Sequence, residues 1–412
     1  MTGQRAVIDF DFRGPGYVER WVESARERVT SCPVAWTEAY GGHWVVSGYE
    51  YVKAVLEDWE TFSSDNRNPD KPLCKGILIP PSPHRLSLSE SDPPVHGPLR
   101  LTEAPFFAPR AIREWEEIAA QRTEEVLDTV IEAGSAEFIR DVATPIPAMT
   151  TMQLAGVPLD HWREFALSAH EMSFRSSEDP LYPFEEIRFV QGKLIELLHD
   201  RRATPRQDVI SAIANRVVDG KPIGDEVGLG MLNAFIFGGF DTATTALANA
   251  LIWLEGKQEL YPRLLDDDAL MRNAVEELLR VYPSNHGIAR TATRDAELGG
   301  QRIKAGDRVY LSWAAANRDP AQFDDPDEVR LDRPNAAMHM SFSGGVHKCL
   351  GAPLARMEIR VVLRAIMRRI PDYRIDRANV VRYPSFGSVA GFDRMPITFT
   401  PGARSRFAEA AK

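Results

Sequence analysis

Residues 341–366 read SFSGGVHKCLGAPLARMEIRVVLRAI and join a glycine-rich loop to the predicted start of a helix. Within this stretch, residues 342–351 follow the pattern F-x-x-G-x-x-x-C-x-G. The segment after the pattern is predicted to be helical, because Pro353 suits a first turn, apolar residues recur at helical spacing and Pro371 ends the run. The stretch therefore places Cys349 close to a helix N-terminus.

The position of Cys349 favours a thiolate, the form of cysteine that binds metals. The positive end of a helix dipole and the amide groups of a loop both stabilise negative charge on sulfur. Gly344, Gly345 and Gly351 would let the loop pack closely against a flat ligand. An inert buried cysteine is the usual alternative, but the ten-residue spacing argues against it. A cysteine nucleophile is a further alternative, and His347 on the same loop has poor geometry as its base.

The composition restricts the class of protein. The chain has 412 residues, a formal net charge of -10 and no block rich in Lys and Arg, so nucleic acid and anionic membrane are not expected partners. Residues 1–30 contain neither a signal-peptide core nor a long apolar run, so we expect a cytoplasmic protein. The cysteines Cys32, Cys74 and Cys349 form no C-x-x-C pair, which argues against a disulfide framework and a zinc site.

The chain shows no repeat, low-complexity block or linker, so we expect one domain over residues 1–412. Residues 33–60 predict two short strands and then a helix, and residues 105–280 are mostly helical by apolar spacing. Residues 283–345 change to short alternating runs with Gly and Asp at the turns. The prediction is a mainly α protein with small β-sheets.

Residues 225–254 predict the longest helix, and its middle is unusual. Gly238 and Gly239 each cost about 1 kcal/mol relative to Ala in a helix interior, so something must compensate for them. One use of such glycines is to let a flat ligand approach the backbone. Thr242 lies four residues after Gly238, on the same face, and Asp241 lies three after it.

Two interpretations of Thr242 and Asp241 stay open at this point. A hydroxyl and a carboxylate beside a glycine gap supply a hydrogen-bond donor and a proton relay to whatever fills the gap. Alternatively, Thr242 donates to the carbonyl four residues earlier and Asp241 pairs with a surface arginine.

Four segments, taken together and in this order, resemble the cytochrome P-450 haem-thiolate monooxygenases of the soluble bacterial type. They are GGFDT (238–242), EELLR (276–280), FDDPDEVRLDRP (323–334) and FSGGVHKCLG (342–351). The resemblance spans nearly the whole chain. It implies the cytochrome P-450 fold, with haem between the long central helix and the cysteine-ligand loop.

The resemblance also implies a cofactor, haem b (iron protoporphyrin IX), whose iron is bound by Cys349. The segment DPPVHGPLR supplies two expected contacts to the haem carboxylates, and charge-assisted pairing explains why cationic groups converge there. A buried ion-pair network of Glu277, Arg280 and Arg333 is expected to brace the cysteine loop. The cofactor-binding residues that the resemblance implies are His96, Arg100, Gly238, Arg290, Phe342, His347, Cys349 and Gly351.

The resemblance implies an oxidoreductase that inserts one atom of dioxygen into a C–H bond of a small organic molecule. A thiolate ligand donates electron density to iron and promotes O–O cleavage. Thr242 and Asp241 are the expected catalytic residues, for hydrogen bonding and proton delivery. Their presence argues against a haem protein that only senses or stores a gas. Atypical oxidations such as phenol coupling, nitration or desaturation use the same ligand and remain open.

Electrons are expected from a separate ferredoxin and its reductase, because no flavin or iron–sulfur segment is seen. A basic row beside and along the helix after Cys349 would dock an acidic ferredoxin, and the alternative is a solvated helix face. This row contains Lys348, Arg356, Arg360 and Arg364. A monomer is expected.

The distal substrate pocket is implied by resemblance alone. Its expected walls are mostly apolar, and the loop 74–92 adds His84 and Arg85 as candidate anchors for a polar group, against the alternative that both are solvated. The expected pocket residues are Ala234, Phe237, Gly238, His286, Ile288 and Val389.

Overall fold

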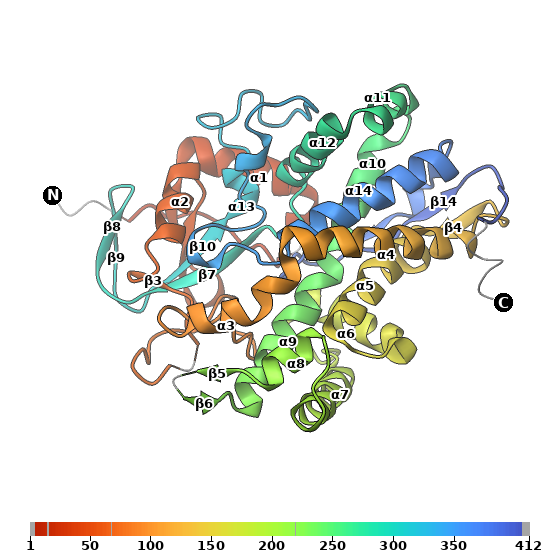
Figure 1. Ribbon diagram of the computed structural model, residues 1–412. Coiled ribbons are helices and arrows are strands. Elements are labelled where there is room, and N and C mark those ends of the chain that lie inside the picture. Colours follow the sequence, from red (N-terminus) through yellow and green to blue (C-terminus); the bar gives the residue numbers. More distant parts are fainter. Residues whose placement is uncertain (1–4, 15, 67, 219, 406–412) are drawn as a thin grey trace.

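The computed structural model describes residues 5–14, 16–66, 68–218 and 220–405 (Figure 1). Most of its regular structure is helical, which confirms the expectation of a mainly α protein. The α-helices are α1 (Tyr17–Ser31), α2 (Tyr49–Glu57), α3 (His96–Glu103), α4 (Pro109–Asp128), α5 (Pro145–Ala155), α6 (Trp162–Phe174), α7 (Phe184–Ala203), α8 (Val209–Ala214), α9 (Asp225–Gly239), α10 (Asp241–Leu254), α11 (Tyr261–Asp266), α12 (Asp268–Val281), α13 (Trp313–Ala316) and α14 (Ala352–Arg369).

The strands form one five-stranded sheet and several smaller ones. The larger sheet has the order β1 (Val34–Thr37), β2 (His43–Val46), β10 (Arg308–Ser312), β7 (Gly287–Ala292) and β3 (Phe62–Ser63). Within it, β10 is parallel to β2 and antiparallel to β7. The smaller sheets pair β11 (Arg374–Ile375) with β14 (Pro396–Thr398) and β4 (Ser135–Glu137), β12 (Val381–Arg382) with β13 (Phe392–Arg394), β5 (Val217–Val218) with β6 (Lys221–Pro222), and β8 (Ala296–Leu298) with β9 (Gln301–Ile303).

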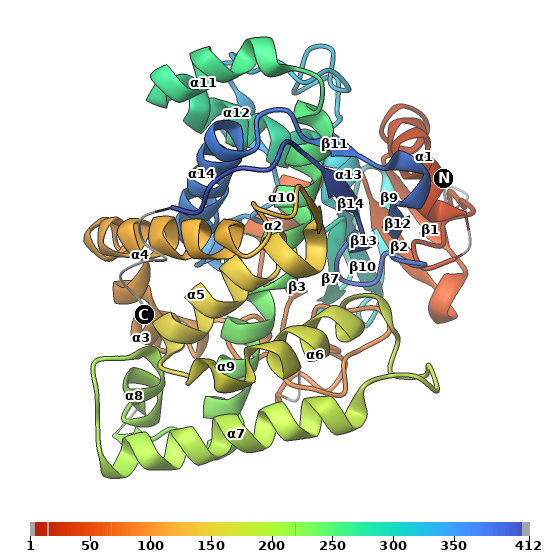
Figure 2. The same cartoon turned by 90° about the vertical axis from the view of Figure 1, so that its right-hand side faces the viewer.

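Helices α9 and α10 run through the middle of the molecule. Figure 2 shows them between the helical region of α4 to α7 and the region of the larger sheet. Two apolar clusters pack against them: one joins α10 to α12 and α14, and the other joins α9 to α5, α6 and α7. The junction of α9 and α10 therefore lies where these two parts of the core meet.

The predicted continuous helix over residues 225–254 is wrong in its middle, because α9 and α10 meet at Phe240, where φ is -91° and ψ is -76°. Near the break, two side-chain hydroxyls donate hydrogen bonds to backbone carbonyls. Thr242 Oγ1 donates to the Gly238 carbonyl at 2.9 Å, and Thr244 Oγ1 donates to the Phe240 carbonyl at 3.1 Å. Such back-bonding bends helices.

The two glycines before the break have different surroundings. A Cβ built on Gly239 would lie 2.6 Å from Thr151 Oγ1, so close packing against α5 requires glycine there. A Cβ on Gly238 would meet no heavy atom of the described residues within 4 Å. Gly238, and not Gly239, therefore faces open space, as expected for close approach of a ligand.

By length and composition, the run Asp225–Leu254 is apolar enough to cross a membrane, and 72% of its most apolar window is buried inside the protein. Such burial inside the protein is typical of a core helix.

Candidate active site

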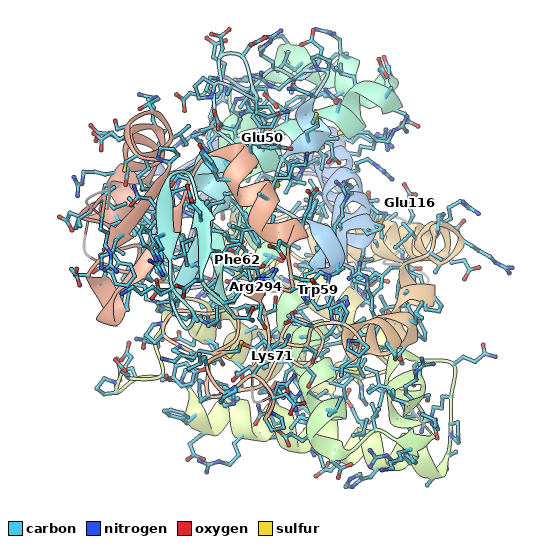
Figure 3. The ribbon with its side chains drawn as sticks, turned by 90° about the vertical axis from the view of Figure 1, so that its left-hand side faces the viewer. Glu50, Trp59, Phe62, Lys71, Glu116 and Arg294 are labelled. Atoms are coloured by element: carbon cyan, nitrogen blue, oxygen red, sulfur yellow. The ribbon has the colours of Figure 1, made fainter. Side chains whose placement is uncertain are left out.

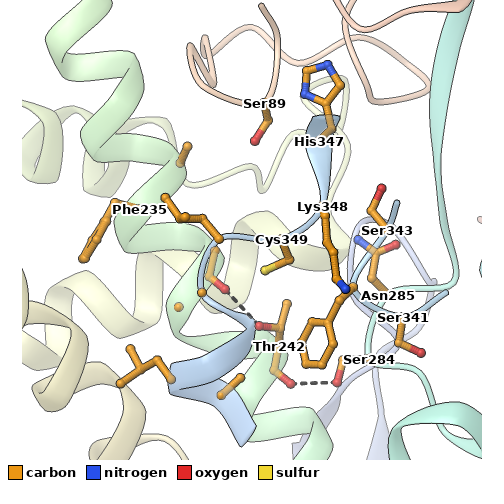
Figure 4. Close-up of a pocket in the computed structure, with 18 of the residues that line it drawn as sticks. Ser89, Phe235, Thr242, Ser284, Asn285, Ser341, Ser343, His347, Lys348 and Cys349 are labelled. Carbon is orange, nitrogen blue, oxygen red and sulfur yellow. Dashed lines mark hydrogen bonds between the residues drawn. The ribbon is translucent and has the colours of Figure 1, made fainter. Parts of the chain in front are cut away.

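A cavity of about 330 Å³ separates the junction of α9 and α10 from the loop before α14. Cys349 projects into it from the loop, and Thr242 and Gly238 line it from the helices (Figure 4). Apolar side chains such as Phe107 and Phe235 complete its walls. The structure thus brings together the cysteine motif and the glycine-rich helix segment, which lie about a hundred residues apart in the sequence.

Backbone contacts fix the loop that carries Cys349. The amide of Cys349 donates to the carbonyl of Phe342 at 2.8 Å. Gly345 has φ 60°, and a Cβ there would lie 2.1 Å from the Leu56 carbonyl oxygen, so this turn requires glycine. Ser343 also adopts a positive φ, 58°, which few non-glycine residues do.

The pKa of the Cys349 thiol differs from the expectation. Burial raises it, and the amides of Gly351 and Ala352 together with the charges of Arg100 and Arg356 oppose this rise without cancelling it. The helix terminus therefore acts in the predicted direction but is outweighed by burial.

A buried ion-pair network lies beneath the loop. Arg280 on α12 donates to both oxygens of Glu277, at 2.7 Å and 2.8 Å, and Arg333 Nε donates to Glu277 Oε1 at 2.8 Å. The two guanidinium groups also donate to backbone carbonyls between residues 317 and 328. The network ties α12 to the segment that leads into the cysteine loop.

Two arginines give the cavity positive charge. Arg100 and Arg290 line it together with His96 and His347, and burial is the main cause that lowers the pKa of each. Because its pKa falls to about 4, the His96 imidazole is neutral near pH 7. His347 Nε2 lies 3.3 Å from Asp92 Oδ1. Within the described part of the chain, buried His347 Nδ1 has no hydrogen-bond partner.

The donor set fits the haem that the sequence resemblance implies. The two guanidinium groups and two imidazoles that line this cavity could pair with the two carboxylates of a haem. His347 Nδ1, which is buried and has no hydrogen-bond partner among the described residues, supplies a further polar contact. Gly238 faces open space in the same cavity that Cys349 lines, so a flat macrocycle held there would find room beside the helix backbone. The residues present therefore match a haem with a cysteine ligand.

Thr242 and Asp241 are adjacent but face different surroundings. Thr242 lines the cavity, whereas Asp241 is buried behind it. The Tyr383 hydroxyl donates to both Asp241 oxygens at 2.8 Å and lies 2.7 Å from His170 Nδ1. His170 Nε2 in turn lies 3.3 Å from Oδ1 of Asp393, an exposed residue. The alternative for Thr242, back-bonding, is present, whereas the surface arginine suggested for Asp241 is replaced by Tyr383 and His170.

A second cavity, of about 220 Å³, adjoins the first and shares Ala234, Gly238, Thr242 and Ile288 with it. Phe237 and Val389 also line it. The expected pocket residues are therefore gathered here, apart from His286.

The prediction for His286 is wrong. Its ring packs between Trp21 and Phe386, with centroids 4.5 Å and 4.8 Å away, and its Nδ1 lies 3.4 Å from the Tyr17 hydroxyl. Asn285, its neighbour, lines both cavities instead. Successive side chains of an extended segment point to opposite sides, so a shift of one residue exchanges a cavity residue for a core residue.

Sequence reasoning missed two buried acids of the first cavity. Burial raises the pKa of Glu103 on α3 and of Glu358 on α14 to about 8 each. Both side chains line the cavity as neutral carboxylic acids near pH 7. Neither position carries a sequence signal, because ordinary helix patterns also place Glu on exposed faces.

The basic row on α14 is paired within the protein. Arg356 donates to Glu276 at 2.5 Å and 2.7 Å, Arg360 donates to Glu116 at 3.0 Å, and Arg364 pairs with Asp268. Figure 3 shows α14 between α2 and α4, with Glu116 on the neighbouring α4. Lys348 is exposed and forms no ion pair among the described residues.

Comparisons with known proteins agree with this geometry. The sequence profile of the family "Cytochrome P450" matches residues 187–370. The chain is 31% identical to the cytochrome P450 monooxygenase PikC of Streptomyces venezuelae, over 87% of this chain and 86% of PikC. It is 34% identical to the nocardicin C N-oxygenase of Nocardia uniformis, over 81% of this chain and 83% of that protein.

Solved structures share the fold. A mutant of P450 EryK in complex with erythromycin B superposes with a TM-score of 0.83 at 29% identity, over 95% of this chain and 100% of that one. Cytochrome P450-153 of Novosphingobium aromaticivorans gives a TM-score of 0.80 at 28% identity, over 93% and 97%. One cavity holds a cysteine together with arginines suited to bind carboxylates, and the relatives agree: this chain belongs to the cytochrome P450 family and is a haem-thiolate monooxygenase.

Proposed function

We propose that this monooxygenase inserts one atom of dioxygen into a C–H bond of a small natural product or natural-product intermediate, with haem b as its cofactor. The observation that carries the proposal is that Cys349, from the loop before α14, and Thr242, from α10, line one cavity together with two arginines and two histidines suited to two carboxylates. When bound, the haem supplies oxygen activation, favoured by electron density from the thiolate.

The side chains of the cavity divide the remaining work. Arg100, Arg290, His96 and His347 would hold the two haem carboxylates. While the Thr242 hydroxyl donates to the Gly238 carbonyl, it can accept a hydrogen bond from the cavity, and it can donate into the cavity only by releasing that carbonyl. We assign proton storage to the Asp241 carboxylate, behind this hydroxyl. The aromatic and aliphatic walls exclude bulk water and hold the apolar part of a substrate.

Relatives support the substrate class. Two of them are named a mycinamicin IV hydroxylase/epoxidase and a nocardicin C N-oxygenase, and the EryK structure contains erythromycin B. An atypical oxidation such as desaturation would use the same residues and differ only in how the substrate lies.

We also propose a ferredoxin with its reductase as the electron source, and a cytoplasmic monomer whose 412 residues form one domain. Lys348 is the cation of the basic row that supports ferredoxin docking best, since three arginines of that row are paired with acids. Complementary charges mainly speed the encounter of two proteins.

The test is oxygen labelling. The holoenzyme is supplied with a ferredoxin, its reductase and NADPH under ¹⁸O₂, and a panel of macrolides, terpenes and aromatic acids is screened by mass spectrometry. The expected product carries one ¹⁸O atom. A product that takes its oxygen from water, or a panel in which no compound is oxidised or stimulates NADPH consumption, would contradict the proposal.

A further inference from the structure

The second cavity carries positive charge and no negative charge on its walls. Among the described residues that line it, none is Asp or Glu, whereas Arg13 and Arg175 are both present. A molecule that lies against Thr242 in the shared part extends into this space. Walls of one sign attract ligands of the opposite sign, most strongly where water is largely excluded.

Arg175 is already neutralised by the protein. Its Nε lies 2.5 Å from Glu171 Oε2 and its Nη1 lies 3.1 Å from Asp179 Oδ2. Two carboxylates therefore occupy its guanidinium, and it has little capacity left for an anionic ligand.

Arg13 differs, because no carboxylate pairs with it. It lies where three segments meet: its Nε donates to the Ile79 carbonyl at 3.3 Å, its Cζ is 5.8 Å from the Phe12 ring centroid, and a Cβ on Gly387 would lie 3.1 Å from its Nη1. Within the described part of the chain it forms no ion pair, and its Nη atoms have no hydrogen-bond acceptor. Burial lowers the pKa of Arg13, against smaller opposing effects of Tyr40, Tyr310 and Asp11.

Tyr182 supplies a second donor to the same cavity, which it lines together with Arg13. Burial raises the pKa of its hydroxyl to about 12, and the charge of Arg13 acts against this rise. The hydroxyl is therefore a neutral donor at physiological pH. Tyr182 is buried and lines the cavity, and no hydrogen bond of its hydroxyl is found among the described residues.

We propose that Arg13 and Tyr182, which line the second cavity but not the first, where Cys349 lies, form a subsite for a carboxylate of the substrate. The inference rests on the proposed function, and it narrows the substrate class to organic acids that are oxidised at a carbon distant from the carboxylate. A guanidinium presents paired N–H groups that match the two oxygens of a carboxylate, and a phenol adds a third hydrogen bond.

The test compares acids with their neutral counterparts. A homologous series of ω-phenylalkanoic acids, their methyl esters and their primary amides is titrated into the ferric holoenzyme. Binding is followed by the spin-state shift of the haem and, independently, by the rise in unfolding temperature. Burial of a charge-assisted pair is expected to make the best acid bind about ten-fold or more tightly than its ester and its amide.

Variants assign the preference to the subsite. Arg13→Gln is expected to bring the acid-to-ester affinity ratio close to one, and Tyr182→Phe to lower it several-fold while leaving every positive charge in place. Arg13→Lys, which keeps the charge, is expected to retain part of the preference and serves where Arg13→Gln folds poorly. Arg188→Gln is the matched control, because it removes one positive charge from the exposed face of α7.

The outcomes separate this inference from the proposed function. Acids that bind no better than esters and amides, acids that do not bind at all, or a preference that survives in both Arg13→Gln and Tyr182→Phe would overturn the subsite. Such results with a normal thiolate spectrum leave the monooxygenase proposal intact. A protein without a haem-thiolate spectrum would overturn the proposed function itself.

Discussion

Thr242 both closes the break between α9 and α10 and lines the cavity. Its hydroxyl donates to the Gly238 carbonyl, and the residue shares the cavity with Cys349. We predict that Thr242→Ala keeps the fold and the haem but uncouples the reaction, so that hydrogen peroxide accumulates in place of product. The ratio of product to NADPH consumed measures this. Thr245→Ala, buried in α10 outside both cavities, is the control. Equal coupling in the two variants would exclude Thr242 from proton delivery.

His170 is held between two carboxylates. Burial lowers its pKa, but hydrogen bonds and charges of Asp241 on α10 and Asp393 on β13 outweigh burial, so that the net shift is upward; Tyr383 also contacts the ring. Because the charged form is the stabilised one, the contribution of His170 to stability is present below its unfolded pKa, about 6.5, and is lost as pH rises through the folded pKa.

Removing either carboxylate should therefore lower the pKa of His170. We predict this for Asp241→Asn and for Asp393→Asn, measured by NMR titration of labelled histidines in the diamagnetic ferrous–CO protein, with His170→Gln to assign the signal. Glu185→Gln on the exposed face of α7 is the control. A titration of His170 unchanged by both substitutions would contradict the hydrogen-bond chain from Asp241 to Asp393.

At the scale of the element, the two glycines before the α9–α10 break give a matched pair. Gly239→Ala would place a methyl group against Thr151 on α5, whereas Gly238→Ala would place it in open cavity. We predict that Gly239→Ala lowers the free energy of unfolding by about 1–3 kcal/mol, as overpacking does. Gly238→Ala should leave the stability of the haem-free protein unchanged or raised and should reduce haem content. Equal effects on stability would contradict the different surroundings.

The loop before α14 offers a test of electron delivery. We predict that Lys348→Glu slows reduction by ferredoxin several-fold at low salt, because it reverses an exposed charge beside the Cys349 loop. Stopped-flow mixing in the presence of carbon monoxide measures the rate, and reduction by dithionite should not change. Lys221→Glu on β6 makes the same charge change elsewhere. If both variants accept electrons as fast as the wild type, ferredoxin docks on another surface.

At the scale of the whole molecule, local patterns and long-range contacts differ in how far the sequence predicts them. The Cys349 loop and α14 were predictable, because glycines, a helix start and apolar spacing all lie within one stretch. The hydrogen-bond partners of Asp241 could not be predicted, because Tyr383 and His170 come from segments that are remote in the sequence and share no motif. His286 was misplaced by one residue, and Arg13 drew no prediction because a lone arginine near the N-terminus has no pattern.

The central claim is that Cys349 holds a haem as a thiolate, and the carbon monoxide difference spectrum of the dithionite-reduced protein tests it most directly. We predict a strongly red-shifted Soret band for the wild type. Cys349→Ser should keep the fold, seen by circular dichroism, and lose this band. A colourless wild-type protein, a Soret band at the position typical of histidine or protonated-thiol ligation, or an unchanged spectrum in Cys349→Ser would contradict the account.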